Sequence, residues 1–93
     1  MAMHFTWDET KRRANLIKHG FDFVDAPPVF EGPTFTAEDD RLAYGEQRFI
    51  TLGVLRGQVV VIAHTEHNNE VRAISMREGT RREQSIFFRY LTD

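Results

Sequence analysis

The pattern of apolar and polar residues predicts four short β-strands. Residues 4–7 alternate polar and apolar side chains, which is typical of a short first strand. Three further stretches are rich in β-branched and aromatic residues: 48–52, 59–63 and 71–77. Arg56-Gly57 has the composition of a hairpin turn and residues 67–70 supply a second turn, so these three stretches are expected to form an antiparallel meander. The near-continuous apolar run 59–63 predicts a central strand covered on both faces.

A first helix is predicted to end at about His19. Thr6 and Glu9, three positions apart, have the spacing of a capping box, and Asp8 is the alternative cap. Gly20 supplies the left-handed residue with which many helices end. The pattern therefore places a helix directly after the first strand.

The two sides of this helix differ in character. Ala14 and Ile17 are its apolar contribution and form a narrow stripe. Lys11, Asn15 and Lys18 follow one another at four- and three-residue spacings, so they share the opposite side. A polar side with two lysines is predicted to be available to a ligand or to solvent.

Helix signals also occur in the middle and at the end of the chain. Asp22 can cap a second short helix, which Pro27-Pro28 is expected to break or kink. Residues 31–46, with an acidic run, are predicted to be a long irregular connection. Thr80 and Glu83 form a second capping box that opens a last helix. The apolar stripe of that helix consists of Ile86, Phe87, Tyr90 and Leu91.

These elements predict an α+β fold, in which an antiparallel sheet packs with N-terminal and C-terminal helices. The sheet comprises the three-strand meander and the short N-terminal strand. At 93 residues the chain has room for one core, so residues 1–93 are expected to form a single domain. The absence of cysteine excludes disulfides and thiolate metal sites. No apolar run approaches membrane-spanning length and no signal pattern opens the chain, so we expect a cytoplasmic protein.

Charge is distributed unevenly along the chain. Residues 22–46 carry a net charge of −6, whereas the segments before and after them each carry +2. Four arginines concentrate around the junction between the last strand and the last helix: Arg72, Arg77, Arg81 and Arg82. A guanidinium group is always charged and its planar fork fits a pair of phosphate oxygens. This cluster favours a polyanion as ligand, with RNA or another phosphate ester as the first candidate.

Three blocks of residues, spread over nearly the whole chain, carry a family resemblance. The first is Phe5-x-Trp7-Asp8-x-x-Lys11-x-x-x-Asn15-x-x-Lys18-His19-Gly20, followed by Phe23, Ala26 and Phe30. The second is Tyr44-Gly45-Glu46-x-Arg48, followed by Gly53 and Gly57. The third is His64-Thr65-Glu66, then Arg72-x-Ile74-Ser75-x-Arg77 and Thr80-x-x-Glu83. In this order the blocks resemble the BrnT family, toxins of bacterial type II toxin–antitoxin pairs.

The resemblance implies a RelE-like fold and a ribonuclease that arrests translation. It also implies a cognate antitoxin, similar to BrnA, whose ribbon–helix–helix part binds operator DNA, so that the toxin itself contacts DNA only through that partner. A hetero-oligomer with the antitoxin is expected, and no cofactor is implied. Two positions depart from the family pattern: many relatives carry arginine at His67 and tyrosine at Phe87. A catalytically weakened homologue that only binds its antitoxin or nucleic acid is therefore the alternative.

Cleavage of RNA without a metal ion requires an aligned 2′-hydroxyl, a base, an acid and cations that stabilise the phosphorane. Arg72 and Arg77 are the predicted phosphate ligands; the alternative for each is an ion pair with a nearby glutamate. His67, in a turn beside them, is the first choice for acid or base, and the alternative is an exposed histidine without a role. His64 is either a second candidate or a buried structural group.

Further contacts are expected on the first and last helices and at the start of the strand predicted at 48–52. The predicted RNA-backbone contacts are Lys11, Lys18, His19, Arg48, Arg81 and Arg82. The predicted antitoxin contacts are Asn15, Phe87 and Phe88. Asn15 could instead fix a loop, and the adjacent phenylalanines cannot both face the core, so one is left for a partner, a base or solvent. His64 and His67, with Glu66 between them, do not share a helical face, and a third ligand beside the two histidines is missing, so no metal site is predicted, and a metal-dependent hydrolase is disfavoured.

Overall fold

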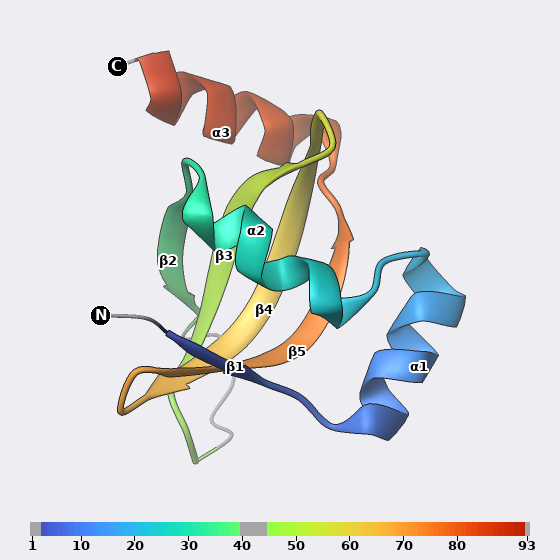
Figure 1. The fold of residues 1–93 in the computed structure, drawn as a ribbon. Coiled ribbons are helices and arrows are strands. Elements are labelled where there is room, and N and C mark those ends of the chain that lie inside the picture. Colours follow the sequence, from blue (N-terminus) through green and yellow to red (C-terminus); the bar gives the residue numbers. More distant parts are fainter. Residues whose placement is uncertain (1–2, 40–44, 93) are drawn as a thin grey trace.

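The computed structural model describes residues 3–39 and 45–92. Its elements are β1 (His4–Thr6), α1 (Glu9–His19), the 3₁₀ turn η1 (Phe23–Asp25), α2 (Ala26–Glu31), β2 (Phe35–Asp39), β3 (Arg48–Leu55), β4 (Gln58–His67), β5 (Glu70–Glu78) and α3 (Arg81–Thr92). The strands form one sheet in the order β1-β5-β4-β3-β2, antiparallel except for the β1–β5 pair (Figure 1). The predicted α+β fold, with an antiparallel meander and terminal helices, is confirmed.

The sheet contains one strand that the sequence pattern did not predict. Residues 35–39 form β2 and pair with β3, where a long irregular connection was expected. The segment begins with Phe35-Thr36, which suit a strand, but it continues into the acidic run. Because β2 is an edge strand whose middle residues are exposed, its charged side chains stay in water.

Local signals at the helix ends are partly confirmed. Asp8 caps α1 by accepting a hydrogen bond from the Lys11 amide at 3.1 Å, and Gly20 ends it in the left-handed conformation. The capping box expected at Thr6 is wrong, because the Thr6 hydroxyl belongs to β1 and donates instead to Glu70 at 3.2 Å. The second capping box, between Thr80 and Glu83, is confirmed in both directions.

The proline pair lies inside a helix rather than ending it. Asp22 caps η1 by accepting from the Val24 amide, and the chain then changes from a 3₁₀ turn to α2 at Ala26. Pro27 and Pro28 fall in the first turn of α2. In the first turn of a helix, backbone amides have no hydrogen-bond acceptor within the helix. Proline at these positions therefore removes no helical hydrogen bond, and the predicted break does not occur.

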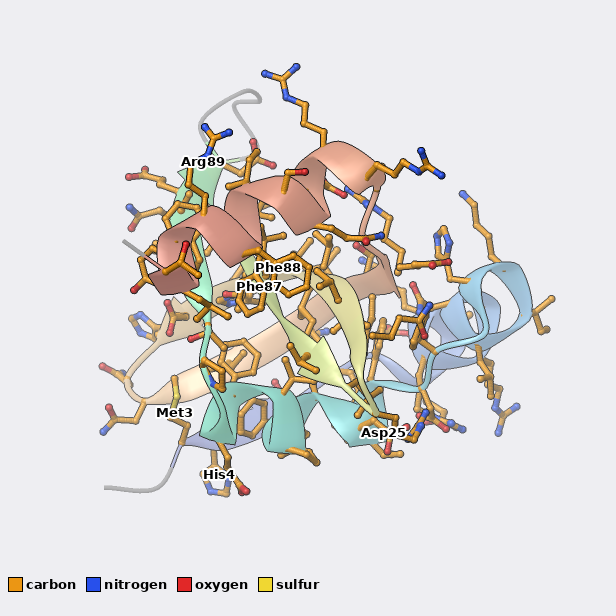
Figure 2. The ribbon with its side chains drawn as sticks, turned by 90° about the horizontal axis from the view of Figure 1, so that it is seen from above. Met3, His4, Asp25, Phe87, Phe88 and Arg89 are labelled. Carbon is orange, nitrogen blue, oxygen red and sulfur yellow. The ribbon has the colours of Figure 1, made fainter. Side chains whose placement is uncertain are left out.

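The sheet separates two apolar clusters, with α2 on one face and α3 on the other (Figures 1 and 2). The cluster on the α2 side contains Phe23, Ala26, Val29, Leu55, Val60, Ile62, Ala73 and Met76. The cluster on the α3 side contains Leu52, Val59, Val61 and Phe87. Successive residues of β4 alternate between the two, which confirms that this strand is covered on both faces. A methyl group at Gly53 would lie 2.4 Å from Val29 Cγ1, so glycine lets α2 approach the sheet.

A β-bulge in β5 changes which side chains face α3. Ala63 pairs with Ser75, whereas the next residue, His64, pairs with Ala73, so Ile74 is an extra residue in β5. In a regular strand Ala73 and Met76 would point to opposite faces, yet both lie in the α2-side cluster. The bulge therefore places Arg72 on the same face of the sheet as Ser75 and Arg77, although it lies at an odd separation from both.

Candidate nucleic-acid interface

Helix α1 is attached to the edge of β5 through one buried polar side chain. Asn15 Nδ2 donates to the Met76 carbonyl at 2.8 Å and to the Phe21 carbonyl at 3.0 Å, while Oδ1 accepts from the Met76 amide at 3.1 Å. The side-chain amide thus forms hydrogen bonds with the backbone of β5, as a neighbouring strand would. It does so at a position along β5 that β1 does not reach. The apolar stripe expected on α1 is wrong, since Ile17 is 87% exposed. Asn15 is buried, so it fixes the fold and does not offer the antitoxin contact that was predicted.

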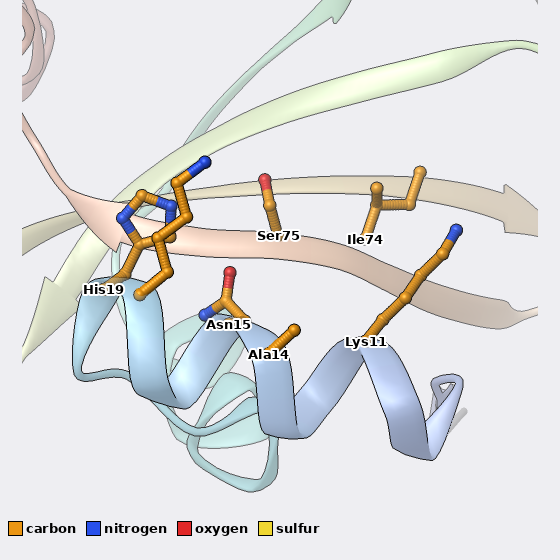
Figure 3. A pocket seen from close by; sticks show the side chains of 7 residues that line it. Lys11, Ala14, Asn15, His19, Ile74 and Ser75 are labelled. Atoms are coloured by element: carbon orange, nitrogen blue, oxygen red, sulfur yellow. The ribbon is translucent and has the colours of Figure 1, made fainter.

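A pocket of about 220 Å³ lies between α1 and β5 (Figure 3). Its lining residues are Lys11, Ala14, Asn15, Lys18, His19, Ile74 and Ser75. The shared side of the helix predicted for the two lysines is confirmed. Ile74 and Ser75 both point toward the pocket because of the bulge (Figure 3). Two cationic side chains, one histidine and no acid line this pocket, so it suits an anionic group such as a phosphate.

Beside the pocket, the α3-facing side of the sheet carries three rows of side chains that run across the strands. The first row, under α3, consists of Phe35, Leu52, Val61 and Arg77. The second consists of Ala37, Ile50, Ala63 and Ser75, and we call it the open strip. The third consists of Asp39, Arg48, Thr65, Arg72 and Thr6. Within the open strip Ala37 is exposed and the other three residues are half-buried.

None of the four arginines of the strand–helix junction lines this pocket. Arg77 Nη1 and Nη2 donate to the two carboxylate oxygens of Glu83 at 2.8 and 2.9 Å. This bidentate contact lowers the pKa of Glu83 to about 2. Arg77 is therefore engaged in an ion pair, the alternative left open by the sequence, and its fork is not available as the predicted phosphate ligand. Arg81 and Arg82 are exposed at the start of α3 and do not line the pocket.

The remaining two predicted arginine contacts lie in the third row. Arg72 is exposed on β5 and is level with Thr65 of β4. Arg48 is half-buried on β3, with Nη2 4.0 Å from Glu46 Oε1. Both therefore border the open strip on the side opposite α3, in the same row as Asp39, so two arginines and one acid line that side of the strip.

His64 lies in the interior on the α2 side. Its ring is fully buried between Phe30 and Phe49, with ring centroids 5.2 and 5.9 Å away. His64 Nε2 lies 2.7 Å from Thr51 Oγ1, which lies 2.7 Å from Thr36 Oγ1. Burial lowers the pKa of His64 to about 4, so the ring is neutral at neutral pH. The proposed catalytic role is wrong for His64, because substrate cannot reach it.

The two other predicted histidines differ in position. His67 ends β4 and is exposed beside the β4–β5 turn, where Asn68 and Asn69 have positive φ. It does not line the pocket, whereas His19 does. The sequence marked His19 only as a backbone contact. His19 lies between Lys18 and Gly20, the residue that ends the helix. This position was the one available signal in the sequence that His19 belongs to the same surface as the lysines.

The phenylalanine pair of α3 divides between core and surface. Phe87 is fully buried in the α3-side cluster, and Phe88 is 53% exposed. The antitoxin contact predicted for Phe87 is therefore wrong, because its ring holds α3 on the sheet. Of the predicted apolar stripe, Phe87 is buried, whereas Ile86, Tyr90 and Leu91 are exposed.

Neither a metal-ligand cluster nor a membrane-spanning helix occurs among the described residues. Within residues 3–39 and 45–92, no three histidine or carboxylate side chains come close enough to hold a metal ion. None of the helices in that part of the chain is long and apolar enough to cross a membrane. Of the residues weighed as metal ligands, His64 is enclosed in the core, while Glu66 is exposed.

Comparison with known proteins agrees with this architecture. Residues 7–83 match the family model described as ribonuclease toxin, BrnT, of type II toxin–antitoxin system. The 1.1 Å crystal structure of the Brucella abortus ribonuclease toxin, BrnT, is similar to this chain with a TM-score of 0.67 and 26% sequence identity, over 86% of this chain and 100% of that one. No curated protein matches the sequence. Because the family match spans most of the sequence and the structures agree, the chain belongs to the BrnT family of ribonuclease toxins of type II toxin–antitoxin systems.

Proposed function

We propose that this chain is an endoribonuclease that cleaves RNA without a metal ion, at the pocket between α1 and β5. The observation that carries the proposal is the set of side chains on one side of α1: Lys11, Lys18 and His19 face Ser75 across the pocket. A phosphodiester placed there meets positive charge and an imidazole, the side chain that most often acts as general acid or base. The polar side of α1 is thus proposed as the reactive surface, in place of the arginine cluster.

In the proposed reaction the RNA supplies its own nucleophile. The 2′-oxygen attacks the adjacent phosphorus and loses its proton to a base, the bond from phosphorus to the 5′-oxygen breaks, and that oxygen receives a proton. The products are a 2′,3′-cyclic phosphate and a 5′-hydroxyl. His19 is the proposed proton-transfer group, and the ammonium groups of Lys11 and Lys18 stabilise charge on the phosphorane oxygens. Since DNA lacks the 2′-hydroxyl, only RNA is a substrate.

The third row supplies contacts to the neighbouring phosphates in this proposal. Arg72 and Arg48 border the open strip and are proposed to bind the RNA backbone on either side of the cleaved bond. His67, at the end of the same face, is an outer contact instead of the acid or base. The exposed Arg81 and Arg82 extend the basic surface over the start of α3.

A type II toxin has an antitoxin as its partner, and we propose that this antitoxin resembles BrnA, with a ribbon–helix–helix part that binds operator DNA. Cleavage of RNA by the free toxin would arrest translation, and the antitoxin would prevent it. Phe88 is the exposed member of the residues expected to contact the antitoxin. The burial of Phe87 also bears on the alternative of an inactive homologue, because a tyrosine hydroxyl at this position would lie inside the α3-side cluster rather than at the pocket.

The proposal is tested with the purified chain, a single-stranded RNA oligonucleotide and excess EDTA. We expect cleavage to continue and to leave 5′-hydroxyl ends, and a single 2′-deoxy substitution at the cleaved position to block it. His19→Gln should lower kcat by about 10²- to 10⁴-fold, the contribution typical of general acid–base catalysis.

The matched control is His67→Gln, which removes an exposed imidazole outside the pocket and should change kcat by less than about tenfold. Loss of activity in EDTA would contradict the metal-independent mechanism. Full activity of His19→Gln would exclude the assignment of His19, and no cleavage of any RNA by the unmodified chain would favour the inactive homologue.

A further inference from the structure

We propose that Tyr90 and Phe35 form a stacking subsite for a nucleobase, at the end of the open strip farthest from the pocket. The inference rests on the proposed ribonuclease function and deepens it, because it assigns a path to the single-stranded RNA. On that path the backbone crosses β5, β4, β3 and β2 along the open strip, and one base reaches α3.

Two side-chain contacts establish which side of α3 faces the open strip. Gln84 Nε2 donates to the Gly79 carbonyl at 3.0 Å, while Glu83 binds Arg77, which lies two residues earlier in β5 and closer to the strip. The side of α3 that carries Glu83 therefore faces the strip. Ile86 and Tyr90 follow Glu83 at three- and four-residue spacings, so they share that side.

Tyr90 is held at its place by an aromatic contact with the sheet. The centroids of the Tyr90 and Phe35 rings are 4.8 Å apart, with the rings tilted by 49°. Phe35 is half-buried in the first row, and Tyr90 is 52% exposed. One part of the tyrosine ring is thus fixed by Phe35 while the rest stays accessible. A fixed and accessible aromatic ring is the kind of platform on which the bases of single-stranded nucleic acids stack.

The open strip connects this ring to the cationic pocket. Three of its four side chains are small, namely Ala37, Ala63 and Ser75, so a chain can approach the sheet closely. From β5 to β2 the strip crosses three strand spacings, about 14 Å. Arg72 and Arg48 lie along the side opposite α3, with Asp39 at its β2 end, and the aromatic ring lies on the α3 side. The phosphates of one strand therefore meet arginines over β5 to β3, and a base beyond them meets the ring. This continuity with the pocket selects RNA, rather than a protein partner, as the occupant.

The experiment compares the binding of a short single-stranded RNA to the wild-type chain, Tyr90→Phe and Tyr90→Ala. The oligonucleotide carries a 2′-deoxy substitution at the cleaved position, so that binding is measured whether or not the chain cleaves. We expect Tyr90→Ala to raise Kd by roughly 5- to 100-fold, the range typical of one stacked base, and Tyr90→Phe to bind almost as tightly as wild type. A dinucleotide, too short to cross the strip, should bind all three proteins equally.

Leu91→Ala is the matched control, because Leu91 is 44% exposed on the same helix but on the side that carries Gln84. It should leave Kd unchanged, and thermal unfolding should show that all variants are folded. An unchanged Kd for Tyr90→Ala would overturn the subsite and assign the ring to a protein contact. An equal loss for the dinucleotide would also overturn it, by showing a general disturbance of the sheet. A failure of the ribonuclease proposal is detected separately, because the chain would then not cleave the RNA that lacks the 2′-deoxy substitution.

Discussion

At the residue scale, Asn15 shows how a polar side chain can hold a helix on a sheet. Its amide makes three hydrogen bonds, two of them to the backbone of Met76. These bonds occupy the edge of β5 where β1 has ended, and they orient α1 so that its lysines face the pocket. The same residue therefore links the stability of the fold to the geometry of the proposed active site.

Asn15→Ala should lower the free energy of unfolding by about 3 kcal/mol, because it leaves the amide and carbonyl of Met76 buried without partners. Chemical denaturation measures this loss. Ile17→Ala is the control on the same helix: its side chain is 87% exposed, so the change should stay within about 0.5 kcal/mol. Equal losses for the two variants would show that the amide contacts do not hold α1.

His64 predicts a specific sensitivity of the fold to acid. Its pKa in the folded state is lowered to about 4, below the 6.5 of an exposed histidine, so between these values the unfolded chain binds a proton that the folded chain does not. Stability is therefore complete above pH 6.5 and decreases as the pH falls toward 4. Between neutral pH and pH 5 the loss should be about 2 kcal/mol.

Urea denaturation at a series of pH values measures this dependence. Glu83, whose pKa is lowered to about 2, loses its contribution only as the pH falls below 4.5, so measurements at pH 5 and above isolate the histidine. His64→Gln should have a smaller slope of stability against pH in that range, whatever its own stability. An unchanged slope would assign the acid sensitivity to other groups.

At the element scale, the sequence predicted those features whose cause is local. The Thr80–Glu83 capping box, the stop at Gly20 and the Arg56-Gly57 turn depend on a few neighbouring residues, and all three are present. In the turn both residues have positive φ, as a type I′ hairpin requires. Features that depend on a distant partner were missed, including β2, which is stabilised by pairing with β3.

The candidate site also combines features that local spacing predicted with features that depend on residues distant in the sequence. The spacing of Lys11 and Lys18 predicted a shared side of α1, and they line one pocket. The bulge at Ile74, which turns Ser75 into that pocket, depends on the register with β4 and has no signal in the sequence of β5. Arg77 carries the same charge as the other arginines of the strand–helix junction. Only the short distance between Arg77 and Glu83 in the structure shows that Arg77 forms an ion pair rather than a phosphate site.

Helix α3 depends mainly on Phe87 for its attachment to the sheet. Phe87→Ala should lower the free energy of unfolding by about 3–5 kcal/mol, the usual cost of deleting a fully buried phenylalanine. Phe88→Ala, the adjacent change on the same helix, removes a ring that is 53% exposed and should cost less than about 1 kcal/mol. Denaturation curves compare the two variants. A similar loss for both would mean that α3 is held by its exposed residues as well.

At the scale of the whole molecule, a net charge of −2 conceals a separation of charge. Acidic residues concentrate in residues 22–46, while the pocket presents lysine side chains and the third row presents Arg48 and Arg72, with Asp39 of the acidic segment at its β2 end. A polyanion is therefore attracted to the pocket and its surroundings, although the protein as a whole is weakly acidic. This arrangement explains how RNA binding is compatible with the composition.

The separation of charge predicts that RNA affinity depends on salt through a small number of phosphate contacts. For single strands, the logarithm of the binding constant falls with the logarithm of salt concentration by about 0.7 per neutralised phosphate. Lys11→Ala combined with Lys18→Ala should therefore reduce the slope by about 1.4, measured between about 50 and 200 mM salt with the 2′-deoxy-substituted RNA.

Arg13→Ala is the control for this experiment, because Arg13 lies on the same helix, is largely exposed and binds Glu9 outside the pocket. It should lower the slope by much less than the lysine pair, since it removes positive charge from another part of the surface. If the slope of the double lysine variant equals that of wild type, the phosphates do not contact α1. The backbone would then follow the arginines of the third row instead, and the reactive phosphodiester would have to lie beside Arg72 rather than beside His19.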